Sequence, residues 1–219
     1  MNKAKSSVSR SVKSSVGRAT SKAKQGVRQK MTIKKDEFLK NLKKVNKEVK
    51  GKIITDFDEF KESWESKADD PAQSILHYLI GAYNYVFEDK QVGEYMCTVV
   101  LAKTFLLPDN KSPTGYKLNP KGDLYFLEHM AETPRTIKSY LGGNPDNNYD
   151  MDPENITMKV VGEQIDKANR FAKIFVQSGG KDFQSPSQMR LNGKNQWKIF
   201  EISSIATGVQ DTEEEKWDF

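Results

Sequence analysis

The chain has 219 residues with 35 Lys or Arg against 30 Asp or Glu, so its formal net charge is +5. No apolar run approaches the roughly 18 residues of a membrane span. The single cysteine, Cys97, excludes an intrachain disulfide framework and fits a reducing compartment. We expect a cytoplasmic protein, free or peripheral at a membrane, with one domain of about 150 residues and a basic arm.

The arm occupies residues 1–35, which hold eleven Lys or Arg and no Asp or Glu. Residues 51–219 hold 27 acidic and 19 basic side chains, so a cationic, Ser-rich arm precedes an acidic body. Val and Ala recur in the arm with an eleven-residue repeat, which places them on one face of a helix. These side chains are too small to offset the entropy of ordering, so we expect the arm to be disordered or conditionally helical.

Four roles of the arm remain open: a solubilising tail, an anionic membrane ligand, a nucleic-acid ligand or a targeting segment. A protein partner is a further alternative. The candidate residues for binding an anionic surface are Lys3, Lys5, Arg10, Lys13, Arg18, Lys22, Lys24, Arg28 and Lys30.

Residues 36–69 are predicted to form an amphipathic helical linker. Apolar residues recur there at helical spacing, namely Phe38, Leu39, Leu42, Val45 and Val49. Asp56 and Glu59 then have the spacing of a capping box, which predicts a short helix that presents Phe57, Phe60 and Trp64. These apolar side chains could dock the linker on the body or on another protein.

Residues 70–210 are predicted to form an α+β domain, with residues 211–219 as an acidic tail. Asp70 and Pro71 indicate the start of an apolar helix. A second helix follows a break at residues 88–90, so the two are expected to form an antiparallel hairpin. A third ends before Pro134. Alternating apolar residues after Pro153, and the hairpin signal Asn192-Gly193, favour an antiparallel sheet packed on these helices.

Several segments resemble an uncharacterised bacterial domain family over about residues 71–210. The most distinctive segment is Ser139-Tyr140-Leu141-Gly142-Gly143-Asn144-Pro145-Asp146-Asn147-Asn148-Tyr149. The others are Val92-Gly93-Glu94-Tyr95-Met96, Ser178-Gly179-Gly180, Ser185-Pro186, Arg190-Leu191, Trp197 and Ser203-Ser204. Val209-Gln210-Asp211-Thr212 departs from the family pattern of an Ile-Arg step followed by Pro. The resemblance implies a domain boundary and no activity.

Candidate chemistry in the body is sparse. Residues 146–154 alternate oxygen-bearing side chains as calcium loops do, yet Met151 and Thr157 replace the Gly and Glu of an EF-hand, which favours a polar turn. Neither His77 nor His129 has metal-ligand spacing, and Cys97 is expected in the core. Ser178-Gly179-Gly180 is interpreted as a turn between strands. A pocket or loop site at Tyr140, Asn148, Tyr149 and Asp150 is a weaker hypothesis.

We expect no catalytic, cofactor or metal site. The favoured function is a non-enzymatic binding or scaffold module that the basic arm localises to an anionic surface. The alternatives are a small-molecule-binding or hydrolytic domain whose pocket gathers only on folding, and a nucleic-acid-associated protein. A cavity that holds carboxylates, His129 or Tyr140 would favour the pocket alternative.

Overall fold

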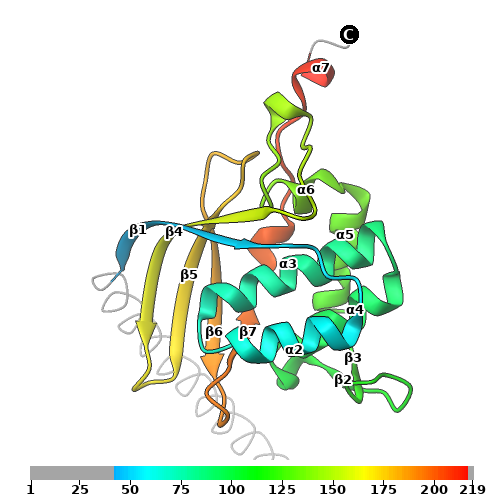
Figure 1. Ribbon diagram of the computed structural model, residues 1–219, viewed down its shortest axis with the longest axis vertical. Helices are drawn as coiled ribbons and strands as arrows, with labels where there is room; N and C mark the ends of the chain where they lie inside the picture. The colour runs from blue at the N-terminus through cyan, green and yellow to red at the C-terminus, as the bar shows by residue number, and fades with distance from the viewer. Residues whose placement is uncertain (1–41, 217–219) are drawn as a thin grey trace, which may run out of the picture. The chain divides into compact units, whose positions relative to one another are not determined.

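The computed structural model describes residues 42–216, so the basic arm and its predicted helical repeat lie outside the described residues. One five-stranded antiparallel sheet and a group of helices form the body (Figure 1). The strand order is β1-β4-β5-β6-β7, which confirms the predicted α+β class. The strands are β1 (Lys43–Gly51), β4 (Ile156–Asp166), β5 (Phe171–Gln177), β6 (Ser185–Leu191) and β7 (Trp197–Glu201).

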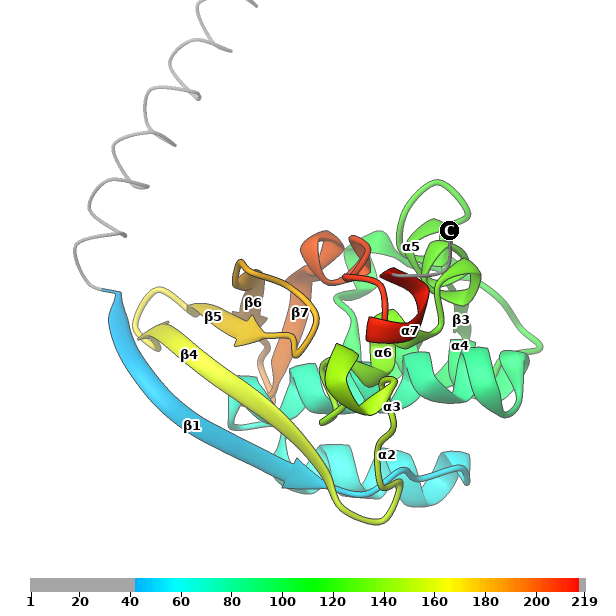
Figure 2. The same ribbon diagram turned by 90° about the horizontal axis from the view of Figure 1, so that it is seen from above.

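The helices lie on one side of this sheet (Figure 2). They are α2 (Phe57–Lys67), α3 (Pro71–Phe87), α4 (Lys90–Val100), α5 (Asp123–Glu132), α6 (Arg135–Lys138) and α7 (Glu213–Lys216). Short 3-10 turns occur at η1 (Lys103–Phe105), η2 (Pro145–Asn147) and η3 (Ser203–Ala206), and a small ribbon at β2 (Leu107–Pro108) and β3 (Tyr116–Lys117). None of the helices in the described part is long and apolar enough to cross a membrane.

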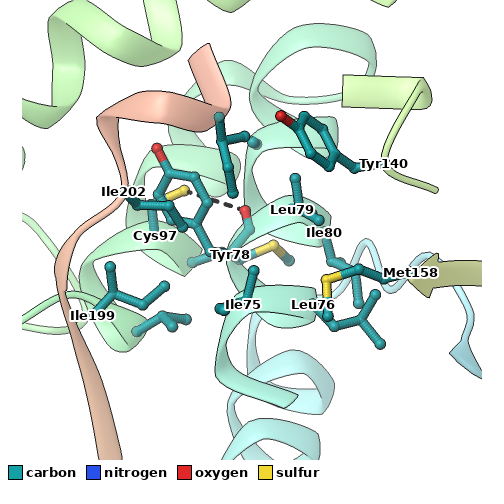
Figure 3. Close-up of a cluster of buried hydrophobic side chains, with 14 of the residues drawn as sticks. Ile75, Leu76, Tyr78, Leu79, Ile80, Cys97, Tyr140, Met158, Ile199 and Ile202 are labelled. Atoms are coloured by element: carbon teal, nitrogen blue, oxygen red, sulfur yellow. Dashed lines mark hydrogen bonds between the residues drawn. The ribbon is translucent and has the colours of Figure 1, made fainter. Parts of the chain in front are cut away.

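Helix α3 is the centre of the core. Fourteen of its seventeen residues are buried, so it is enclosed on nearly all sides rather than amphipathic. Figure 3 shows its residues Ile75 and Leu79 among side chains from α4, β4, β7 and the turn that follows α6. Gly93 lets α4 approach closely, since a Cβ there would lie 2.1 Å from the backbone nitrogen of Tyr85. The predicted helical hairpin is therefore a tightly packed pair.

Aspartate side chains begin three helices, as the sequence predicted for two of them. Asp56 accepts a hydrogen bond from the Glu59 backbone nitrogen at 2.8 Å, and Asp70 accepts one from that of Ala72 at 2.9 Å. Asp89 caps α4 in the same way, through its carboxylate and two backbone nitrogens. Each cap satisfies donors that the first helical turn leaves free.

The helix predicted over the first part of the linker is wrong for residues 43–51, and residues 36–41 lie outside the described residues. Residues 43–51 form the strand β1, which pairs antiparallel with β4 from Lys43↔Glu163 to Gly51↔Ile156. Val45 and Val49 are four residues apart, a spacing that puts them on one face of either a helix or a strand. Pairing with β4 decides between the two. Val49 is buried in the core together with Phe60 and Trp64 of α2.

The hairpin between β6 and β7 is present, but its turn differs from the two-residue form that Asn-Gly signals. Leu191 pairs with Trp197, so five residues connect the strands, and Asn195 rather than Gly193 has a positive φ, of 58°. The Asn192 carboxamide oxygen accepts from the backbone nitrogens of Lys194 and Gln196. This side chain therefore stabilises the longer turn. On the outer side of β7, Ala102 donates to the carbonyl of Ile199.

Candidate functional site

A pocket of about 290 Å³ opens where β1 ends and where α2 crosses α3. Its floor is apolar and its rim is polar, as ligand sites commonly are. The lining residues are Lys50, Gly51, Lys52, Ile54, Glu59, Ser63, Lys67, Gln73, Leu76, His77, Ile80 and Glu154.

Ser63 and His77 form the polar centre of this pocket. The Nδ1 atom of His77 is 2.7 Å from the backbone oxygen of Gln73, and its Nε2 atom is 3.1 Å from the hydroxyl of Ser63. A carbonyl only accepts, so Nδ1 carries the proton and Nε2 accepts from Ser63. Burial lowers the pKa of His77 to about 4, and nearby Lys67 adds to this effect. The ring is therefore neutral at pH 7.

The rim carries more positive than negative side chains. Lys52 pairs with Glu59 at 3.1 Å, whereas Lys67 forms no ion pair with any described residue. Lys50 reaches only Glu48, at 4.0 Å and with both side chains exposed, an arrangement of little strength. Two of the three lysines are thus available to a ligand.

An unpartnered acceptor also belongs to the pocket wall. The side-chain oxygen of Gln73 is buried and has no hydrogen-bond partner in the structure. A buried polar atom without a partner costs about 1–3 kcal/mol, so a turn of the Gln73 amide that lets its oxygen accept from solvent or a bound molecule would stabilise this position.

The Ser63–His77 pair resembles the arrangement that activates a serine nucleophile, with the carbonyl of Gln73 orienting the ring. A base with a pKa near 4 accepts a serine proton poorly at pH 7. The pair is thus better suited to holding a ligand than to attacking one. The two residues are 14 positions apart on different helices, so their sequence spacing gave no signal.

Two of the four residues of the predicted loop site are buried. Tyr140 and Tyr149 are each only 1% exposed, while Asn148 and Asp150 lie exposed on the loop before β4. The Tyr149 hydroxyl donates to the backbone oxygen of Gln210 at 2.7 Å. Asn148 has a left-handed backbone, with φ 52°. The four residues therefore divide into two buried tyrosines and two exposed loop residues.

Tyr140 belongs instead to a buried cluster around Lys181. The Lys181 ammonium donates to the Tyr140 hydroxyl at 2.8 Å and to that of Thr207 at 2.8 Å. Tyr140 in turn shares a 2.5 Å hydrogen bond with Ser185. Burial lowers the pKa of Lys181 to about 8 and raises that of Tyr140 to about 12. Lys181 was not among the predicted site residues, because it belongs to no sequence motif.

Four of the segments that carry the family resemblance meet around this cluster, namely residues 139–149, 178–180, 185–186 and 203–204. The Ser178 hydroxyl donates to Ser139, and the Gly179 nitrogen donates to the Ser139 backbone oxygen at 2.7 Å. A Cβ on Gly180 would lie 2.3 Å from the Tyr149 hydroxyl, so only glycine fits there. Gln210, where the chain departs from the family pattern, joins through its backbone. These segments therefore tie two loops and the C-terminal segment together.

The remaining candidates have structural roles. Cys97 is fully buried, and its sulfur points at the backbone oxygen of Tyr78 (Figure 3). Burial raises its pKa, which keeps the thiol protonated. His129 lies beside Glu132 on α5, away from the pocket lining. The calcium-like loop is a polar turn, in which Asp152 accepts from the Glu154 nitrogen. The described residues contain no His, Cys, Asp and Glu group suited to a metal ion.

Comparison with family models identifies a domain of unknown function, DUF6935, over residues 52–213. The chain belongs to the DUF6935 family. The match begins just after β1 and includes the pocket residues of α2 and α3 as well as the Lys181 cluster. Searches of curated proteins and of solved structures returned no match. Any function of this DUF6935 domain must therefore be argued from its own geometry.

Proposed function

We propose that the chain is a non-enzymatic binding module, cytoplasmic and held at an anionic surface by its basic N-terminal segment. The observation that carries this proposal is the charge of β1 and the residues after it. Between residues 43 and 52 the chain has five lysines and one glutamate, and all five lysine side chains are exposed. The cationic run of the arm thus continues into the fold.

The distribution of these lysines supports one-sided attachment. Lys47 is tied to Asp70 at 2.8 Å, whereas Lys43 and Lys44 have no ion pair with a described residue. Each cation near an anionic membrane contributes about 1 kcal/mol, and salt screens this attraction. Because residues 51–219 are net acidic, an anionic surface would repel the rest of the body. The basic N-terminal segment therefore determines which end of the protein approaches the anionic surface.

Vesicle binding tests this proposal. Full-length protein is expected to bind phosphatidylglycerol vesicles at low salt and to leave them at high salt, and deletion of residues 1–35 should remove most of the binding. The charge reversals Lys43→Glu and Lys44→Glu should weaken it further. The matched control reverses Lys111 and Lys121, two exposed loop lysines of the acidic body, and should bind like the wild type.

Absence of binding to anionic vesicles at low salt would refute the membrane form of the proposal. Stronger, salt-dependent binding to duplex DNA that also requires residues 1–35 would point to the nucleic-acid alternative.

A small-molecule-binding function is the second candidate, favoured by the pocket at Ser63 and His77. The pocket combines an apolar floor, available cations and an unpartnered acceptor, although it lies away from the expected Tyr140 and His129. Its test is direct titration with candidate ligands.

A further inference from the structure

The side chains around the pocket define what a ligand must carry. Lys50 and Lys67 offer positive charge from the end of β1 and from the last turn of α2. Glu154 adds an exposed carboxylate to the lining, and the buried side-chain oxygen of Gln73 becomes a second acceptor once its amide turns toward the pocket. Both require donors from a ligand. A suitable molecule therefore bears an anionic group and hydroxyl groups together.

The type of cationic side chain indicates which anionic group the pocket would bind. All the cationic side chains at the rim are lysines among the residues described, and none is an arginine. Arginine matches the planar carboxylate with two parallel hydrogen bonds, whereas lysine binds phosphate as a point charge. Ammonium groups that approach from separate elements suit the oxygens of a tetrahedral phosphate.

The apolar floor and the size of the pocket fit the rest of the molecule. Leu76 and Ile80 are buried beneath the rim and can contact the C–H face of a small ring or polyol. A volume of about 290 Å³ is at the lower end of small-molecule sites. It would hold one sugar-sized unit.

We propose that the pocket between β1, α2 and α3 binds the phosphate ester of a small polyol, with Lys50 and Lys67 on the phosphate and Gln73 and Glu154 on the hydroxyls. This inference rests on the small-molecule candidate function and is independent of the surface attachment by the basic segment. The ester can be a soluble sugar phosphate or the headgroup of a lipid, since both present an anionic phosphate ester beside hydroxyl groups.

Calorimetric titration of the full-length protein with glucose 6-phosphate and with glycerol 3-phosphate tests the proposal. At least one ester is expected to bind more tightly than inorganic phosphate or glucose alone. Lys67→Gln should weaken binding about tenfold, because one charge-assisted hydrogen bond is lost. Gln73→Leu should weaken it about threefold to tenfold and keep the carbonyl that holds His77.

Lys61→Gln is the matched control, since Lys61 lies exposed on the same helix and outside the pocket lining. It should bind like the wild type, and thermal melts should show all three variants folded. Failure of both esters to bind, or an equal loss in Lys61→Gln and Lys67→Gln, would overturn the proposal. Vesicle binding by the basic segment would be unaffected by that failure, so the two proposals are separable.

A second experiment distinguishes a lipid headgroup from a soluble ligand. Full-length protein is mixed with phosphatidylinositol vesicles at high salt, which screens the basic segment. Retention that glucose 6-phosphate displaces and Lys67→Gln abolishes supports the proposal with a lipid headgroup. Release at high salt, with esters still bound in solution, supports it with a soluble ligand.

Discussion

Lys181 is a buried cation that forms no ion pair with a carboxylate of the described residues. Its ammonium donates to the hydroxyls of Tyr140 and Thr207 and to the backbone oxygens of Ser204 and Ile205. These four acceptors offset part of the cost of removing the charge from water. The lysine is only 7% exposed and links the loop after β5 to the segment after β7.

The lowered pKa of Lys181 makes stability depend on alkaline pH. The folded state releases this proton at about pH 8, and the ordinary value is 10.5, so the unfolded state binds more protons between these limits. The free energy of unfolding from this group therefore rises with pH from about 8 to 10.5. Urea unfolding between pH 7.5 and about 9.5 should show this rise. Cys97 offsets part of it, because burial raises its pKa and the unfolded state therefore loses the thiol proton first.

Lys181→Met should make the rise smaller. Burial also lowers the pKa of Lys198 to about 8. Lys198→Met should therefore remove a separate part of the rise in the free energy of unfolding, and the double variant should remove both contributions. An unchanged pH dependence in Lys181→Met would show that its hydrogen bonds cancel the effect of burial.

Contacts between individual side chains were the features that the sequence predicted least well. Ser63 and His77 meet because α2 crosses α3, and Lys181 meets Tyr140 because two loops converge. No local spacing encodes either contact. Tyr140 and Tyr149 belong to the segment that resembles the family, and the sequence therefore drew attention to them. The structure buries both side chains instead of exposing them to a ligand.

Among the elements, α2, α3 and β7 are joined by one buried chain of hydrogen bonds. The Trp64 indole nitrogen donates to the Ser74 hydroxyl at 3.1 Å, which donates to the backbone oxygen of Trp197 at 2.8 Å. The Trp197 indole nitrogen also donates to the backbone oxygen of Asp69 at 3.1 Å. One serine hydroxyl thus satisfies a buried donor and a buried acceptor from two other elements.

Ser74→Ala should therefore be strongly destabilising for so small a change. It leaves the Trp64 nitrogen and the Trp197 oxygen without their partner, which we expect to lower the free energy of unfolding by about 2–4 kcal/mol. Ser66→Ala is the control: this exposed hydroxyl bonds only a carbonyl of its own helix, so the change should stay below about 0.5 kcal/mol. Equal effects in chemical denaturation would contradict this interpretation.

The elements that were predicted correctly are those with unambiguous local signals. Asp70-Pro71 identified the start of α3, and the alternation from Ile156 identified β4. Strand β1 was wrongly predicted to be a helix, because valines four residues apart fit both the helical period of 3.6 residues and the strand period of 2. The pairing that decides its conformation comes from β4, distant in the sequence, so no local pattern could reveal it.

For the molecule as a whole, β1 and α2 belong to the packed core. Val49, Ile54, Phe60 and Trp64 are all buried with the residues of α3. Each large apolar side chain contributes about 1.5–3 kcal/mol when buried, so the four together approach the stability of a typical domain. The fold therefore requires the residues before Asp70.

Shortened chains test this requirement. Residues 43–219 should unfold cooperatively with a melting temperature within a few degrees of the full-length protein. Residues 70–219 should give no cooperative transition in circular dichroism, since they lack β1 and α2. A sharp melt of the shorter chain would show instead that the domain begins near residue 70, the boundary predicted from the sequence.

Strand β1 also has a consequence for biosynthesis. Its paired residues in β4, from Ile156 to Glu163, stand about 100 to 120 positions later in the chain. At about 5–20 residues per second, a ribosome needs roughly 5–25 s to deliver them. During that interval β1 has no partner strand, and its lysines supply the charge that keeps an unpaired strand from joining other nascent chains.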